Sequence, residues 1–153
     1  MENNIEVLKK VTDELLNLMS VSATTQVSYD EENKVFNVNI SETDATGLLI
    51  GKKGETLTSI ESILGFILKT KLGEWYRVAV NIGDYKEKEE DYLKNLADAV
   101  VTRVKASEKP ENIYNLKGWQ RRVVHMYLAE KYPEISSESE GEGEERCLVI
   151  KVK

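Results

Sequence analysis

A glycine-bracketed turn between two apolar segments is the feature that most constrains how this chain can fold. The turn, Gly51-Lys52-Lys53-Gly54, follows the short apolar piece 45–50. After it, apolar residues recur at three- and four-residue spacing, as on one face of a helix: Leu57, Ile60, Ile63, Leu64, Ile67 and Leu68. The pattern predicts two helices joined by a tight turn, the second of them packed on a core.

The residues around these two helices predict a small unit of helices and strands. An opening amphipathic helix is indicated by Ile5, Leu8, Val11, Leu15, Leu18 and Met19. The turn-like segment 30–33 separates an apolar piece around Val27 from the alternating residues 35–40, as in a hairpin. A third strand is predicted by alternation over 75–82. The expected order is helix, two strands, two helices, strand.

The second half predicts another unit after a long helix. That helix starts near Asp84 and carries a core stripe of Leu93, Leu96, Ala97, Val100 and Val104. A short strand at Ile113 and Tyr114, a helix capped by Asn115 and running to about Lys131, and a closing hairpin of 135–139 with 146–152 complete the pattern. We expect two domains, 1–84 and 85–153, in an α+β fold.

The glycine-bracketed turn has two possible functions. A phosphate-binding P-loop needs four residues between its first glycine and the Gly-Lys-Ser/Thr unit, but only three follow Gly47, and Lys53 replaces the hydroxyl. An NTPase is therefore not expected. The alternative is that Gly51 and Gly54 allow the backbone to approach phosphates, which then face the N-terminus of the following helix.

A second set of basic residues lies on the last predicted helix. Arg121 and His125 are four residues apart and share one face, with Arg122 beside them. The helix wheel puts the apolar side opposite, on Trp119, Val123, Met126 and Tyr127. This face could contact a strand of phosphates or a stacked base. A solvated or locally bonded histidine is the alternative reading.

Charge and composition limit the range of functions. The 153 residues carry a formal net charge of -6, with acid concentrated at 87–91 and 138–145, while Lys52, Lys53, Lys69 and Lys71 cluster. Local basic sites are thus compatible with an acidic chain. Cys147 is the only cysteine and no targeting or membrane-spanning segment is evident, so we expect a cytoplasmic protein without a disulfide.

These motifs together resemble a known family. Helix, hairpin, short helix, Gly-Lys-Lys-Gly, long helix and strand look like a type II KH domain. The spacing Arg121-Arg122-Val123-Val124-His125 resembles the R-x-x-x-H domain. Their order resembles the C-terminal part of the bacterial Jag family, also called KhpB or SpoIIIJ-associated proteins, over nearly all 153 residues. The Jag domain that commonly precedes these two is not part of the resemblance, so its role is not carried over.

The resemblance implies binding of single-stranded RNA, or alternatively single-stranded DNA, by a post-transcriptional regulator or RNA chaperone linked to the cell envelope and cell elongation. A KH loop of this type clamps about four nucleotides. The resemblance assigns the phosphates to the turn and the bases to an adjacent apolar groove. The implied binding residues are Leu49, Ile50, Gly51, Lys52, Lys53, Gly54, Ile60, Arg121, Arg122 and His125.

An enzyme is not expected, because one histidine, one cysteine and mostly exposed carboxylates offer no catalytic set. No metal or cofactor is expected either, since the acidic run 138–145 lacks the ligand order of an EF-hand. The main alternative is a protein interaction module, for which the resemblance suggests a small single-KH protein as partner. The segment 115–120 lacks the proline and acidic residue of the R-x-x-x-H family, so its contacts are expected to differ.

Overall fold

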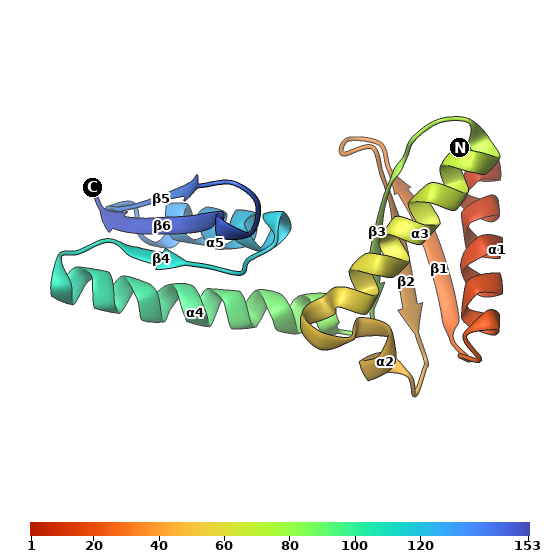
Figure 1. Ribbon diagram of the computed structural model, residues 1–153, viewed down its shortest axis with the longest axis horizontal. Coiled ribbons are helices and arrows are strands. Elements are labelled where there is room, and N and C mark those ends of the chain that lie inside the picture. The colour runs from red at the N-terminus through yellow and green to blue at the C-terminus, as the bar shows by residue number, and fades with distance from the viewer. The chain divides into compact units, whose positions relative to one another are not determined.

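The computed structural model describes residues 1–153. The chain divides into two compact units, Met1–Lys86 and Glu87–Lys153, each with its own hydrophobic core (Figure 1). Both units combine helices with a three-stranded sheet, so the expected α+β class is confirmed.

The first unit has the predicted order of elements. It contains α1 (Glu2–Leu18), β1 (Thr24–Asp30), β2 (Val35–Ser41), α2 (Thr46–Ile50), the 3-10 turn η1 (Lys52–Gly54), α3 (Glu55–Leu72) and β3 (Arg77–Ile82). In the sheet, β2 lies centrally, antiparallel to β1 and parallel to β3. The expected KH-like arrangement is thereby confirmed.

The parallel pairing of β2 and β3 explains where the glycine-bracketed turn lies. Parallel strands need a crossover connection, and here the crossover is α2, η1 and α3. Along β2, Phe36, Val38 and Ile40 are buried in the core, whereas Asn37 and Asn39 between them are not. Helix α3 contributes Ile60, Leu64 and Leu68 to the same core, which fixes its first turn beside the sheet.

The second unit is built around the long helix α4 (Tyr85–Ser107), whose first two residues belong to the first unit. It continues with β4 (Glu111–Ile113), α5 (Gly118–Lys131), β5 (Ile135–Glu140), the short η2 (Gly143–Glu145) and β6 (Cys147–Val152). Strand β6 lies between β4 and β5 and is antiparallel to both. Residues of α4, α5 and all three strands form one core.

The start of α5 differs from the sequence prediction. Asn115 does not cap the helix; its backbone lies in the left-handed region with a φ of 59°. Lys117 is the N-cap instead, and its backbone N–H donates to Oε1 of Gln120 at 2.7 Å. The prediction was wrong because it chose Asn115 as a residue type that often caps helices. In the structure the side chain of Gln120, three residues after the N-cap, accepts the hydrogen bond instead. Tyr114, predicted to belong to the short strand, lies just outside β4, which ends at Ile113.

Candidate nucleic-acid interface

The turn between α2 and α3 has a backbone shape that depends on glycine. Gly51 has φ 69° and ψ -176°, a region that is essentially restricted to glycine. Gly54 follows in the left-handed region with φ 72°. Lys53, which is not glycine, also has a left-handed conformation, with φ 52° and ψ 29°. Three positive φ values within four residues therefore produce the sharp reversal between the two helices.

Gly51 is also required because of its neighbour. A Cβ at this position would lie 2.8 Å from Cβ of Thr56 and closer still to the Thr56 hydroxyl oxygen. No side chain can be added without moving the first turn of α3. The close packing of Thr56 on Gly51 thus holds the loop against the start of the helix.

The loop presents its two lysines next to the positive end of a helix. Lys52 and Lys53 are exposed, and α3 begins directly after them at Glu55 and continues for 18 residues. The aligned peptide dipoles of such a helix favour an anion at its N-terminus. The arrangement combines two mobile ammonium groups with a fixed backbone dipole, which suits a phosphodiester chain.

The apolar residues predicted beside the loop are mostly core residues. Leu49 is fully buried and Ile60 is 3% exposed, so neither offers its side chain to a base in this structure. Both stabilise the positions of α2 and α3 from beneath, and their assignment to the base-binding groove stays a prediction. Ile50 is half-buried and remains at the surface next to Gly51.

Helix α5 carries the second set of predicted residues. Its buried stripe is Gln120, Val124 and Leu128, four residues apart, with Trp119, Val123 and Tyr127 partly buried. Met126 is 59% exposed, which corrects its predicted place on the apolar side. The helix wheel failed here because a polar residue, Gln120, occupies the core stripe. It does so by donating from Nε2 to Oε1 of Glu89 at 2.7 Å, besides accepting from Lys117.

Arg121 and Arg122 differ in how they are held. The Arg121 guanidinium is half-buried and donates to the carbonyl oxygen of Leu116, just before the helix. Arg122 is exposed. No ion pair with an acidic side chain involves either guanidinium. Arg121 is thus a positioned cation, and Arg122 is an exposed cation beside it in the sequence.

His125 is oriented by strand β5. Its Nδ1 lies 3.0 Å from the carbonyl oxygen and 2.7 Å from the hydroxyl oxygen of Ser137. The carbonyl oxygen can only accept from Nδ1, whereas the hydroxyl can donate or accept according to the tautomer of the imidazole. Sequence reasoning missed this contact, because the helix and the strand are brought together only by the fold.

A cluster around Asp98 was also missed. The Asp98 carboxylate on α4 accepts from the hydroxyl groups of Tyr127 and Tyr132 and from Nζ of Lys131, at 2.8–3.1 Å. The Lys131 ammonium also lies 5.1 Å and 5.3 Å from the centroids of those two rings. The cluster joins α4 to the end of α5 and so fixes the helix that bears Arg121 and His125.

Two classes of site find no support in the structure. No helix is both long and apolar enough to span a lipid bilayer. No group of three or more His, Cys, Asp or Glu side chains is arranged to hold a metal ion.

Comparison with known proteins identifies both halves of the chain. Residues 5–81 match the family model described as "KhpA/KhpB, KH domain", and residues 91–152 match the family model of the R-x-x-x-H domain. A curated relative from Clostridium symbiosum, named RNA-binding protein KhpB, is 29% identical over 150 residues, which are 97% of this chain and 64% of the relative. The relative of the same name from Bacillus subtilis is 29% identical over 135 residues, 88% of this chain and 64% of the relative. The one from Lactiplantibacillus plantarum is 24% identical over 98% of this chain and 46% of its own length. The chain thus spans less than two thirds of these relatives.

Proposed function

Because the chain belongs to the KhpA/KhpB family of KH-domain proteins, we propose that it binds single-stranded RNA through the loop Gly51–Gly54 and the α5 face formed by Arg121, Arg122 and His125. The observation that carries the proposal is the shape of the loop. Its glycine-only backbone at Gly51, locked by Thr56, holds two exposed lysines at the N-terminus of an 18-residue helix. The relatives' name, RNA-binding protein KhpB, agrees with this use.

The loop holds the sugar-phosphate backbone and leaves the bases accessible. Lys52 and Lys53 neutralise phosphates, while the absence of a side chain at Gly51 allows the strand to approach closely. Ile50 is the predicted apolar residue that reaches the surface here, so base contact beside the loop is assigned to it. Contacts of this kind require an unpaired strand, because the bases of a duplex are stacked and paired.

The α5 face provides a second, modest contact. Arg121 is oriented by its hydrogen bond to Leu116, and His125 is oriented by Ser137, so both side chains are positioned before a ligand arrives and lose little further entropy. Two linked weak sites on one chain raise the overall affinity by increasing the effective concentration of the second contact. The role of a post-transcriptional regulator or RNA chaperone linked to the envelope follows from the family resemblance, and we retain it as part of the proposal.

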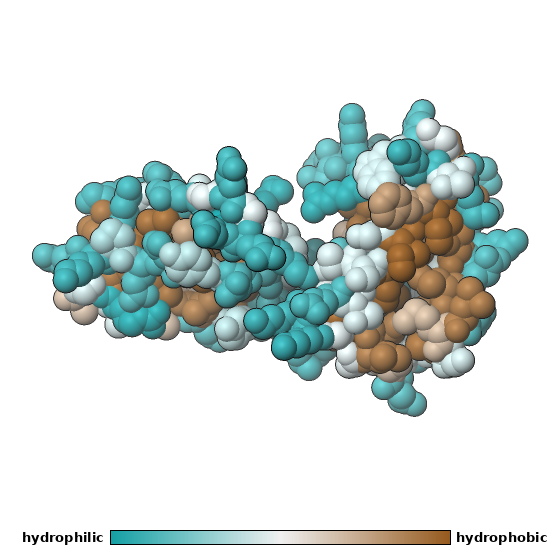
Figure 2. Space-filling model, viewed as in Figure 1, coloured by the Kyte–Doolittle hydropathy of each residue, from teal (hydrophilic) through white to brown (hydrophobic).

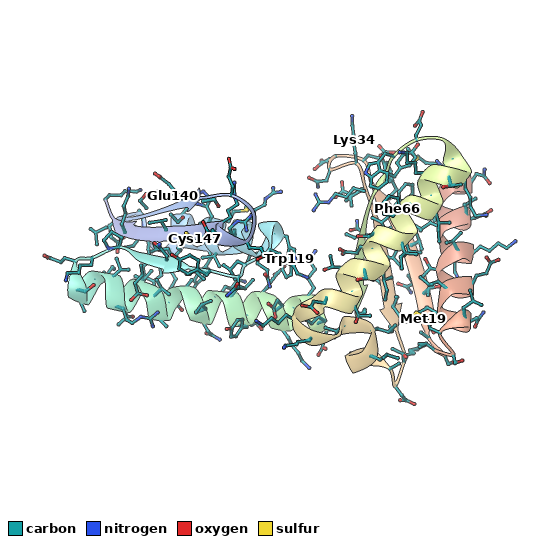
Figure 3. All side chains as sticks on the ribbon, in the orientation of Figure 1. Met19, Lys34, Phe66, Trp119, Glu140 and Cys147 are labelled. Carbon is teal, nitrogen blue, oxygen red and sulfur yellow. The ribbon has the colours of Figure 1, made fainter.

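Charge reversal in the loop tests the first site. Binding of a labelled single-stranded RNA, followed by fluorescence anisotropy, is compared for Lys53→Asp and Lys34→Asp. These two exposed lysines have the same φ of 52°, so backbone strain and charge change are matched. Lys34 lies at the end of the first unit away from α2 (Figure 3). We expect a strong loss for Lys53→Asp only; equal affinities would contradict the proposal.

The salt dependence of binding tests the rest of the interface. If about four phosphates of a single strand are neutralised, log affinity should fall with log salt at a slope of roughly -3. Arg121→Ala/His125→Ala should weaken binding and make that slope shallower, because the Arg121 cation no longer contacts the strand. A flat salt response in the wild type would refute binding through phosphates.

The same variants distinguish RNA binding from the alternative role as a protein interaction module. A small single-KH protein, the partner implied by the resemblance, should still assemble with Lys53→Asp if pairing uses a different surface. An intact wild type that binds the partner and no RNA, even at low salt, would favour the interaction module.

A further inference from the structure

An aromatic pair is exposed on the first unit. Phe66 on α3 and Trp75, in the connection between α3 and β3, are 61% and 57% exposed. Their ring centroids are 5.4 Å apart and the rings are nearly perpendicular, at 74°. Figure 2 shows hydrophobic surface gathered over the side of the first unit that α3 occupies, and Figure 3 labels Phe66 on that helix. Adjacent large aromatic side chains left in water commonly mark a binding surface.

The Trp75 indole packs against helix α3. A Cβ added to Gly65, one turn before Lys69, would lie 3.9 Å from Cη2 and Cζ2 of Trp75, so the ring rests on the α3 backbone. Phe66 contacts it from the side. Nζ of Lys69 lies 5.6 Å from the centroid of the Trp75 ring. The ammonium thus lies over the ring in a cation–π contact. When the Lys69 side chain turns from the ring to a phosphate, the ring can accept a stacked base.

This aromatic pair lies along the same helix as the loop. Phe66 follows Gly54 by twelve residues, which is about 18 Å of helix at 1.5 Å per residue. Between Gly51 and Arg77 the chain has five basic and three acidic residues, so this segment is positive although the chain as a whole carries -6. An anionic strand is therefore favoured over a neutral or basic protein surface as the occupant.

We propose that Trp75, braced by Phe66, is a base-stacking platform for the RNA strand that leaves the Gly51–Gly54 loop, with Lys69 contacting a phosphate of that strand. The proposal rests on the proposed function, because the loop must first hold the strand. Stacking on an aromatic face tolerates every base, so the platform would add affinity without strong base preference. It would require an unpaired base, and so it would help to discriminate single strands from duplexes.

The test uses Trp75 as its own reporter. The chain has two tryptophans, so Trp119→Phe leaves Trp75 as the sole one. In the full chain with this change, a single-stranded RNA of about ten nucleotides, long enough to reach from the loop to the aromatic pair, is titrated while tryptophan fluorescence and anisotropy are recorded. We expect quenching of Trp75 that saturates together with binding.

Affinity is then measured for Trp75→Ala, Trp75→Phe and Tyr92→Ala, with circular dichroism to confirm folding. Loss of one stacked base should weaken binding by about 5- to 150-fold for Trp75→Ala. Trp75→Phe should lose less, because it retains an aromatic face. Tyr92, 59% exposed on α4, is the matched control, and its substitution should leave affinity unchanged.

The outcomes separate this inference from the proposed function. RNA binding that is lost in Lys53→Asp but unchanged in Trp75→Ala, without quenching of Trp75, would overturn the stacking platform and leave the loop proposal standing. In that case the aromatic pair would be a surface for protein contact. No RNA binding by the wild type would refute both.

Discussion

At the residue scale, the absence of a Cβ atom at Gly51 determines the shape of the loop. Its φ and ψ are accessible to glycine alone, and the place where a Cβ would lie is filled by Thr56. The two restrictions are independent, one from the residue's own backbone and one from its neighbour. Because the two restrictions add, a substitution of Gly51 should destabilise the fold more than a substitution of a turn glycine that is restricted by its backbone alone.

Gly51→Ala should therefore destabilise the first unit by about 3 kcal/mol, because backbone strain and overpacking add. Gly73→Ala is the control: Gly73 has a φ of 78°, but nothing lies within 4 Å of an added Cβ, so only strain of about 1 kcal/mol is expected. Urea unfolding followed by circular dichroism measures both. Equal losses would mean that the contact with Thr56 is easily relieved.

Glu61 is a second residue with a defined local task. Its Oε1 accepts a hydrogen bond of 2.9 Å from the Val80 backbone N–H on β3, the strand at one edge of the first sheet. Open edge groups invite pairing with other chains, and a carboxylate placed against them discourages it.

Glu61→Ala should expose the Val80 amide and cost about 1 kcal/mol, whereas Glu61→Gln keeps an oxygen acceptor and should cost less. Hydrogen exchange of the Val80 amide, followed by NMR, distinguishes the two variants. The amide should exchange faster in Glu61→Ala than in Glu61→Gln. The same rate in both would show that the carboxamide does not replace the carboxylate.

At the element scale, hydrophobic spacing predicted the helices, the hairpins and the β3 strand, because each buries one face. The same reasoning placed Lys52, Lys53, Arg122 and His125 at the surface, where the structure has them. It failed where tertiary packing decides: Gln120 occupies a core stripe and Met126 is exposed. The Ser137 contact of His125 joins a helix to a strand and has no local signal.

The Asp98 cluster joins α4 to α5, and the stability that it contributes depends on pH. Desolvation raises the pKa of Asp98, but hydrogen bonds from Tyr132, Lys131 and Tyr127 outweigh it and lower the pKa below its ordinary value of 3.8. A carboxyl group with a lowered folded-state pKa stabilises the fold fully above its unfolded pKa. Its contribution is lost as pH falls through the lower, folded value.

Asp98→Asn should thus lower the free energy of unfolding at pH 6 by about 1 kcal/mol, a modest figure because the Asp98 side chain is 35% exposed. The difference from wild type should narrow as pH falls below 3.8. Urea unfolding at a series of pH values measures it. Asp91→Asn, at an exposed position of the same helix, should not change the free energy of unfolding to a comparable extent.

At the scale of the whole molecule, an acidic chain is proposed to bind a polyanion. The exposed segment around η2, with Glu142, Glu144 and Glu145, belongs to the same unit as the Arg121 and His125 face. Repulsion from such a segment would weaken indiscriminate binding and leave only strands that are held by specific contacts.

Glu142→Gln/Glu144→Gln should therefore tighten RNA binding at low salt. Glu2→Gln/Glu6→Gln on α1, which makes the same charge change, should have a smaller effect. The gain in RNA affinity from Glu142→Gln/Glu144→Gln should disappear toward 1 M salt, where the screening length shrinks to about 3 Å. Anisotropy titrations across salt concentrations measure it, and an advantage that persists at high salt would exclude a charge effect.

The parallel ladder between β2 and β3 has a consequence for how the first unit folds. It pairs Val35 with Arg77, and the Gly51–Gly54 loop lies in the chain that must close between them. Closing so long a segment costs entropy before any pairing energy is gained, so this ladder is expected to form slowly relative to the β1–β2 hairpin. During synthesis, the fold of the first unit would be completed only when β3 has emerged and paired with β2, so the proposed RNA binding through the loop would begin late in translation.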